Sequence, residues 1–166
     1  MSIELLLWKE ADIPSILQHA NNRNIWNHVR DDFPHPYTQK DAEEWIARNK
    51  AQDPPTSFSI SVDGKAVGAV GVVLKSDVYR KNAEIGYWLA EPFWNQGITS
   101  EAVRLFCSYC FASFDVARLY AGVFANNPAS MRVLDKNGFQ QEAILHSAVY
   151  KNASLMDEYI FARLRS

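Results

Sequence analysis

The segment from Glu84 to Val103 combines residue types that can together bind a phosphate group. A run typical of a strand ends at Pro92, a short polar turn with Gly97 follows, and an amphipathic helix begins at once. The first amide groups of a helix lack partners within the helix, and its dipole adds positive charge at the same point. Gly97 lets the backbone approach a ligand closely. This pattern predicts a phosphate site built from main-chain N–H groups. A plain strand-to-helix turn would account for the same residues.

A second polar turn lies between Phe124 and Phe139. Asn127 is suited to cap a helix that has Pro128 at its first position. Ser130 lies one turn into that helix. Capping of the helix by Asn127 does not explain why a serine stands at this position. The turn therefore offers a hydroxyl and an amide side chain for chemistry, or a helix cap without chemistry.

The long stretch from Asn24 to Tyr37 is aromatic and polar, which is more typical of a binding loop than of a simple connection. Asp31 or Asp32 could attract a cationic amine, and ordinary surface charge is the alternative. Trp26 and His28 belong to the same stretch.

Hydrophobic periodicity predicts one α/β domain over residues 1–166. Its order is β-α-α-β-β-β-α-β-α-β-β, which implies a mostly antiparallel central sheet of six to seven strands with one parallel pair and helices on both faces. The expected strands are Ile3–Trp8, Phe58–Val62, Ala66–Leu74, Ala83–Ala90, Arg118–Phe124, Glu142–Tyr150 and Met156–Leu164. The expected helices follow caps at Asp12 and Thr38, or span Ser100–Ser113 and Ala129–Lys136.

Composition excludes several classes of protein. The net charge of −2 and the lack of a Lys/Arg run argue against nucleic acid as a partner. No apolar stretch has the length of a membrane span, and no signal peptide is recognisable, so a cytoplasmic location is expected. Cys107 and Cys110 fall on the apolar face of a predicted helix and are expected to be buried, with no metal site.

Three of these segments together resemble the GNAT family of N-acetyltransferases, in particular its RimJ/RimL-like branch that modifies protein N-termini. They are Ala83-Glu-Ile-Gly-Tyr-Trp-Leu89, Trp94-Asn-Gln-Gly-Ile-Thr99 and Asn127-x-x-Ser130 with Gly138-Phe139. The predicted order of elements also matches the GNAT fold over essentially the whole chain. The second segment departs from the usual Gln/Arg-x-x-Gly-x-Gly/Ala pattern at Trp94, Asn95 and Thr99.

The resemblance implies an enzyme that transfers the acetyl group of acetyl-CoA directly to a primary amine. It implies acetyl-CoA contacts at Trp88, Leu89, Ala90, Asn95, Gln96, Gly97, Ile98, Thr99, Ser100 and Asn127. Glu84, or a water molecule that it holds, would remove a proton from the amine. Ser130 would protonate the leaving thiolate, because Leu134 stands where many GNAT enzymes carry a tyrosine acid. The amine would meet Trp26, His28, Asp31, Asp32 and Tyr87.

The acceptor stays open at this point. The resemblance favours the N-terminal amine of a protein, such as a ribosomal protein, over an amino acid, a polyamine or an aminoglycoside. A catalytically silent module that binds acyl-CoA is a further alternative. An aromatic content of 13% leaves room for a homodimer surface.

Overall fold

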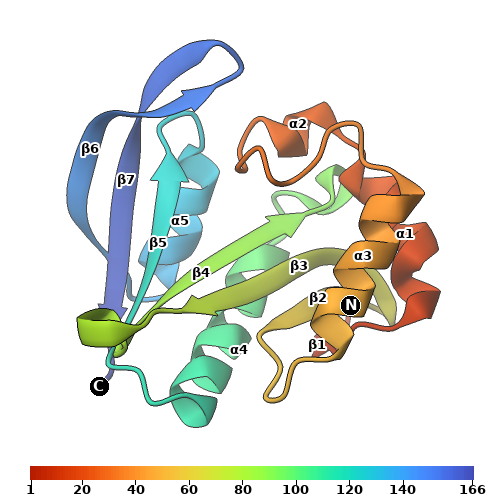
Figure 1. The fold of residues 1–166 in the computed structure, drawn as a ribbon, viewed down its shortest axis with the longest axis horizontal. Helices are drawn as coiled ribbons and strands as arrows, with labels where there is room; N and C mark the ends of the chain where they lie inside the picture. The colour runs from red at the N-terminus through yellow and green to blue at the C-terminus, as the bar shows by residue number, and fades with distance from the viewer.

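The computed structural model describes residues 1–166 and contains one seven-stranded sheet flanked by helices. Its strands lie in the order β1-β2-β3-β4-β5-β7-β6 (Figure 1). They are β1 (Ile3–Leu6), β2 (Ser57–Val62), β3 (Lys65–Leu74), β4 (Asn82–Leu89), β5 (Arg118–Phe124), β6 (Gln140–Lys151) and β7 (Ser154–Leu164). The α-helices are α1 (Ile13–Ala20), α2 (Arg23–Trp26), α3 (Gln39–Lys50), α4 (Ile98–Ser113) and α5 (Pro128–Lys136). The predicted mixed α/β fold is confirmed.

The pairing of β4 with β5 is the one parallel pairing in the sheet, and it is short. Residues 82–84 pair with 118–120, and no pairing continues beyond Glu84 and Tyr120. From there β4 stays with β3 and β5 stays with β7, so the two strands separate (Figure 1). The backbone groups that face each other across this separation are left without a strand partner.

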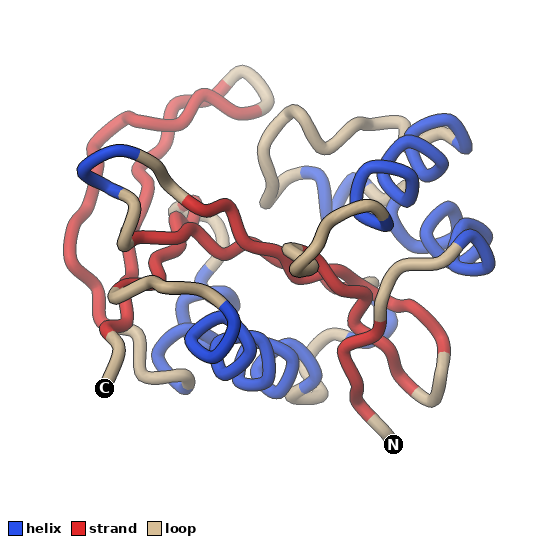
Figure 2. Tube along the Cα trace, turned by 60° about the horizontal axis from the view of Figure 1, so that its bottom comes forward, coloured by secondary structure: helices blue, strands red, loops and turns tan.

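Helices cover both faces of the sheet (Figure 2). A cluster of 22 buried residues joins the sheet to α4 and α5, and it includes Phe106 and Leu134. A smaller cluster of 8 buried residues joins α1 and α3 to the sheet through Trp8, Ile16 and Ile46. Burial of this apolar area is the main stabilising contribution to such a fold.

Cys107 and Cys110 are free and fully buried in the larger cluster, as expected from their place on the helix. Burial raises the pKa of Cys107 to about 11, so its thiol stays protonated and packs as a small apolar group.

Local sequence explains most element ends. Thr38 caps α3, because its hydroxyl accepts from the Asp41 amide at 3.3 Å and Asp41 accepts from the Thr38 amide at 2.8 Å. Asp63 and Gly64 both have positive φ in the β2–β3 hairpin, as the sequence pair predicts.

Three local predictions differ from the structure. Asp12 does not cap α1 with its side chain, which instead accepts from the Lys9 amide at 3.1 Å in a preceding 3-10 turn. Helix α4 begins at Ile98 and not at Ser100, because Gly97 serves as its N-cap. Helix α2 covers the start of the Asn24–Tyr37 stretch, which the sequence predicts to be a binding loop, and Asn22 caps this helix by accepting from the Asn24 amide at 2.8 Å.

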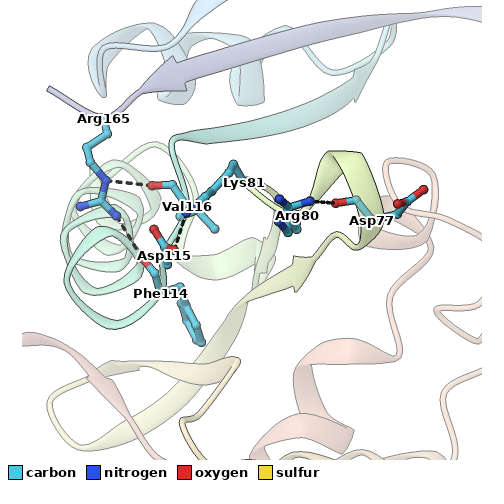
Figure 3. A network of polar contacts seen from close by, with 7 residues as sticks. All are labelled: Asp77, Arg80, Lys81, Phe114, Asp115, Val116 and Arg165. Atoms are coloured by element: carbon cyan, nitrogen blue, oxygen red, sulfur yellow. Dashed lines mark hydrogen bonds and ion pairs between the residues drawn. The ribbon is translucent and has the colours of Figure 1, made fainter.

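Polar contacts hold β4 and β5 together at the end where they pair (Figure 3). Arg165 donates to the carbonyl groups of Phe111, Phe114 and Val116 at 2.8 to 3.0 Å, which satisfies the C-terminal end of α4. Lys81, just before β4, pairs with Asp115, just before β5. The strands are therefore anchored at one end and separate at the other.

Candidate active site

The turn between β4 and α4 has a conformation that explains its sequence. Asn95 and Gly97 both adopt positive φ, at 61° and 77°, and Asn tolerates this region better than most residues. The Trp94 indole donates to the Leu89 carbonyl at 2.7 Å and so fixes the turn against the end of β4. The departures at Trp94 and Asn95 are thus compatible with an ordered turn.

The N-terminus of α4 presents free donors beside this turn. Gly97 has no side chain to cap the helix, and the first bond of the helix runs from the Glu101 amide to the Gly97 carbonyl at 3.2 Å. No hydrogen bond within the chain uses the amides of Ile98, Thr99 and Ser100. A Cβ atom added to Gly97 would meet nothing within 4 Å, so the space beside the turn at Gly97 is open. This arrangement suits an anion.

Asn127, Ser130 and Tyr87 come together on one side of the separated strands. Asn127 caps α5 by accepting from the Ser130 amide at 3.3 Å. The Ser130 hydroxyl lies 2.7 Å from the hydroxyl of Tyr87 on β4. Burial raises the pKa of Tyr87, so this phenol stays protonated and can donate. A tyrosine predicted to meet the acceptor therefore contacts the predicted acid.

Glu84 lies on the opposite face of β4, since alternate residues of a strand point to opposite sides. Its carboxylate accepts from the Arg30 guanidinium at 2.6 Å. The Glu84 side chain is 18% exposed and that of Arg30 is 66% exposed, so Arg30 lies over the carboxylate on the solvent side. The predicted base is thus already half of an ion pair.

The aromatic loop between α2 and α3 lies over this face. Asp31 accepts from the ammonium of Lys151 at 2.7 Å, and that ammonium also lies 3.6 Å from the centre of the Trp26 ring. The Lys151 side chain is 2% exposed although it carries a charge. The cation that Asp31 attracts is thus Lys151 at the end of β6, in the chain itself. Asp32 is exposed and free of ion pairs.

Helix α2 and the loop after it are tied to the turn between β4 and α4 and to the β5–α5 turn. The side-chain amides of Asn22 and Asn24 donate to the Glu91 carboxylate at 2.8 to 3.1 Å. The Asn126 amide donates to the Asn27 carbonyl at 3.3 Å. Burial lowers the pKa of His28 beside Asn126, which keeps its imidazole neutral.

A polar cavity of about 250 Å³ opens where the loop meets the β6–β7 turn. Five lining residues supply amide, hydroxyl and ammonium groups, and one is apolar: Asn27, Asn126, Lys151, Asn152 and Ser154, and then Met156. Such groups can hydrogen-bond a polar ligand.

A family model described as "Acetyltransferase (GNAT) domain" matches residues 2–140. The chain belongs to the GNAT family. The predicted family resemblance is thereby confirmed.

Relatives of this GNAT chain include an uncharacterised N-acetyltransferase, YoaA, of Bacillus subtilis, which is 34% identical over 58% of this chain and 54% of its own length. A ribosomal-protein-serine acetyltransferase of Escherichia coli is 31% identical over 64% of this chain and 59% of its own length. The matches therefore span little more than half of each relative. A crystal structure of RimL, a ribosomal-protein α-N-acetyltransferase in complex with coenzyme A, superposes with a TM-score of 0.85 over 99% of this chain and 94% of that chain, at 23% identity.

The structure also places the remaining predicted cofactor residues. The Ala90 amide donates to the Val67 carbonyl at 2.8 Å, and Trp88 packs edge-on against Phe33 of the loop. The Ala90 amide is therefore engaged within the chain, and the Trp88 side chain contacts the loop. Asn95, Gln96 and Gly97 are exposed, and Thr99 and Ser100 are half-buried beside them.

Two charged residues at the site were not predicted from the sequence. Arg30 lies next to Asp31 in the loop, and Glu158 lies on β7 beside Gly122 of β5. A glycine within β5 was the available signal, since it leaves room for a neighbouring side chain. No group of three or more His, Cys, Asp or Glu side chains is arranged to hold a metal ion, and no helix is long and apolar enough to cross a membrane.

Proposed function

We propose that this protein is an acetyl-CoA-dependent N-acetyltransferase that acts on the N-terminal amine of a protein or peptide. The observation that carries this proposal is the start of α4, which has no side-chain cap and lies beside the separated strands β4 and β5. The three free amides of Ile98, Thr99 and Ser100 are suited to the pyrophosphate of the cofactor. The unpaired backbone between β4 and β5 is suited to its extended amide-bearing arm.

In direct transfer, proton removal from the amine and release of the thiolate take place on opposite faces of β4. The amine approaches on the face of Glu84, where a carboxylate removes its proton, and its nitrogen then bonds to the thioester carbon. The carbon–sulfur bond breaks towards the opposite face, where Ser130 and Tyr87 can protonate the thiolate. A backbone N–H near Leu89 polarises the thioester carbonyl in this proposal. No covalent enzyme intermediate is required.

A peptide acceptor is favoured by the polar cavity beside the loop. Its amide and hydroxyl groups, from Asn27, Asn126, Asn152 and Ser154, match the donors and acceptors of a peptide backbone. The similarity to a ribosomal-protein-serine acetyltransferase points in the same direction.

A small amine is the second candidate, and the ties on the loop favour it. The Lys151–Asp31 pair holds the loop, and the contacts of Asn22 and Asn24 with Glu91 hold α2 before it. An acceptor site beside a loop fixed in this way suits a small amine, such as an amino acid or a polyamine, better than a protein terminus.

The first test is calorimetric binding of acetyl-CoA to the wild type and to Gly97→Trp. Gly64→Trp is a matched control, because Gly64 also has positive φ and open space at its Cβ position but lies in the β2–β3 hairpin. Binding that is lost in Gly97→Trp and kept in Gly64→Trp supports the site at α4. Equal binding by both variants would place the cofactor elsewhere.

The second test measures CoA thiol release with peptides that begin with serine, with free amino acids and with polyamines. Turnover with the peptide at the higher kcat/KM supports the protein-terminus acceptor. Preference for a free amino acid or a polyamine supports the second candidate. Binding of acetyl-CoA without turnover of any amine would leave a silent acyl-CoA-binding module.

A further inference from the structure

Two carboxylates and not one face the acceptor side of the separated strands. Glu84 pairs with Tyr120 of β5 in the sheet register, and Glu158 of β7 pairs with Phe124. Tyr120, Gly122 and Phe124 alternate along β5 and so share a face. Directly paired residues also share a face, which places Glu84 and Glu158 on the same side of the sheet.

Gly122 lets the Glu158 side chain lie across β5. A Cβ atom at position 122 would be 2.9 Å from both the carboxyl carbon and Oε2 of Glu158. The carboxylate therefore occupies the space that any other residue at position 122 would fill. Because β5 borders the separation from β4, Glu158 reaches across its own neighbour towards the place where the thioester is proposed to lie.

The two carboxylates differ in their ion-pair partners. Glu84 is held by Arg30 at 2.6 Å, whereas Glu158 has no hydrogen-bond or ion-pair partner in the chain. The Arg30 guanidinium occupies Oε1 of Glu84, so an amine must compete with Arg30 for that carboxylate. Both oxygens of the half-buried Glu158 carboxylate are free to accept a proton.

The surroundings of Glu158 agree with this difference. Burial, and then the charge of Glu84, raise the pKa of Glu158, while Arg30 opposes the shift. A general base works best when its pKa lies near the working pH. The shift therefore moves Glu158 in the direction that proton removal from an amine requires.

We propose that Glu158 is the general base of this acetyltransferase, and that Glu84 acts with Arg30 as a positioning pair beside it. This assignment rests on the proposed function. Glu158 takes one proton from the ammonium of the acceptor, and the nitrogen lone pair then forms the bond to the acetyl carbon. The electron pair of the broken carbon–sulfur bond stays on sulfur, and the proton on Glu158 passes to solvent. The nitrogen loses its second proton as the amide forms, and the thiolate takes up one proton through Ser130, so that the products are the amide and the thiol of CoA.

The test compares pH profiles of kcat/KM for the wild type, Glu158→Gln and Glu84→Gln, with acetyl-CoA binding measured for each. We expect Glu158→Gln to lose about 100-fold or more near pH 7, within the usual range for a lost general base. The loss should shrink as pH rises through the pKa of the amine itself, about 8 for a terminal amine, because the amine then needs no base. A merely structural role of Glu158 would lower the profile without changing its shape.

Gly122→Ala tests the same carboxylate without removing it. The added methyl group would displace the carboxylate of Glu158, and the expected effect is a loss of about 10-fold in kcat/KM. The double variant Gly122→Ala/Glu158→Gln should then be no worse than Glu158→Gln alone, since both changes remove one interaction. Glu4→Gln, at an exposed position on the far edge strand, is the matched control and should keep full activity.

The opposite results would overturn the assignment. If Glu84→Gln alone flattens the acid side of the profile while Glu158→Gln retains it, then Glu84 is the base. Additive losses in the double variant would show that Gly122 acts independently of Glu158. A wild type that binds acetyl-CoA but acetylates no amine would instead refute the proposed function, and the assignment with it.

Discussion

The hydroxyl of Tyr87 on β4 lies 2.7 Å from that of Ser130 on α5. The two residues are 43 positions apart in the chain and meet where β4 has left β5. A protonated Tyr87 that donates to Ser130 leaves the serine proton free to point elsewhere. This pair therefore defines the side of the separation on which a leaving thiolate can be protonated.

Replacing Ser130 by Ala should lower kcat by about 10-fold and leave acetyl-CoA affinity nearly unchanged. The effect is modest because a thiol with a pKa of about 8.5 is already a good leaving group. Tyr87→Phe should cost less, since it removes only the group that orients the serine. Steady-state CoA release measures both, with Ser108→Ala on the exposed side of α4 as control. An unchanged kcat in Ser130→Ala would exclude the serine as the acid.

Removing the charge of Arg30 should shift the pH profile. Arg30 lowers the pKa of Glu158, so Arg30→Met should raise that pKa further and move the acid limb of kcat/KM to higher pH. It also leaves Glu84 without its partner at 2.6 Å. Arg48→Met, on α3 beside Trp45, removes a charge away from Glu84 and Glu158 and should leave the limb in place. If the acid limb of kcat/KM lies at the same pH in Arg30→Met and in the wild type, the charge of Arg30 does not affect the pKa of the base.

The Lys151–Asp31 pair should respond unequally to loss of either partner. The Lys151 side chain is 2% exposed and that of Asp31 is 71% exposed. Asp31→Asn leaves a buried ammonium with only the Trp26 ring, whereas Lys151→Met leaves an exposed carboxylate in water. We expect Asp31→Asn to reduce the free energy of unfolding by roughly 1 kcal/mol more than Lys151→Met. Urea unfolding at neutral pH measures the difference, and the reverse order would contradict it.

Breaking the Lys151–Asp31 ion pair should also weaken binding of the acceptor amine. Because Lys151 ties the β6–β7 turn to the loop over Glu84, Lys151→Met should raise the acceptor KM several-fold and leave acetyl-CoA binding unchanged. Lys50→Met is a control, since its ammonium contacts only Glu10, far from the loop. Equal acceptor KM values in Lys151→Met and the wild type would show that the loop does not take part in binding the acceptor.

The sequence predicts those parts of the site that depend on near neighbours. The Gly97 turn, the Asn127 cap and the Thr38 cap each depend on residues within a few positions, so residue types and spacing suffice. Arg30 and Glu84 are 54 positions apart, and Lys151 and Asp31 are 120 apart. Such pairs arise only when the sheet assembles. The sequence therefore allows Asp31 to attract a substrate amine or to be ordinary surface charge, and it does not predict the pairing with Lys151. Glu158 gives no signal of its own.

A raised pKa for Glu158 has a consequence for stability as well as for activity. In the folded protein its charged form is disfavoured by burial and by Glu84, whereas in the unfolded chain its pKa is the ordinary value of about 4.3. The folded state therefore binds the proton more tightly. The stability that protonated Glu158 contributes is therefore fully present at pH values below its pKa in the unfolded chain. This contribution is lost as pH rises through the pKa of Glu158 in the folded protein.

Glu158→Gln, which is neutral at every pH, should for this reason be more stable than the wild type at pH 7. The gain should disappear near pH 4, where Glu158 is protonated in the folded protein. Thermal unfolding of both proteins from pH 4 to 8 measures the difference in Tm, and Glu4→Gln controls for loss of a surface charge. If Glu158→Gln is less stable than the wild type at pH 7, the carboxylate of Glu158 stabilises the folded protein. That result would contradict the prediction that the charged carboxylate destabilises it.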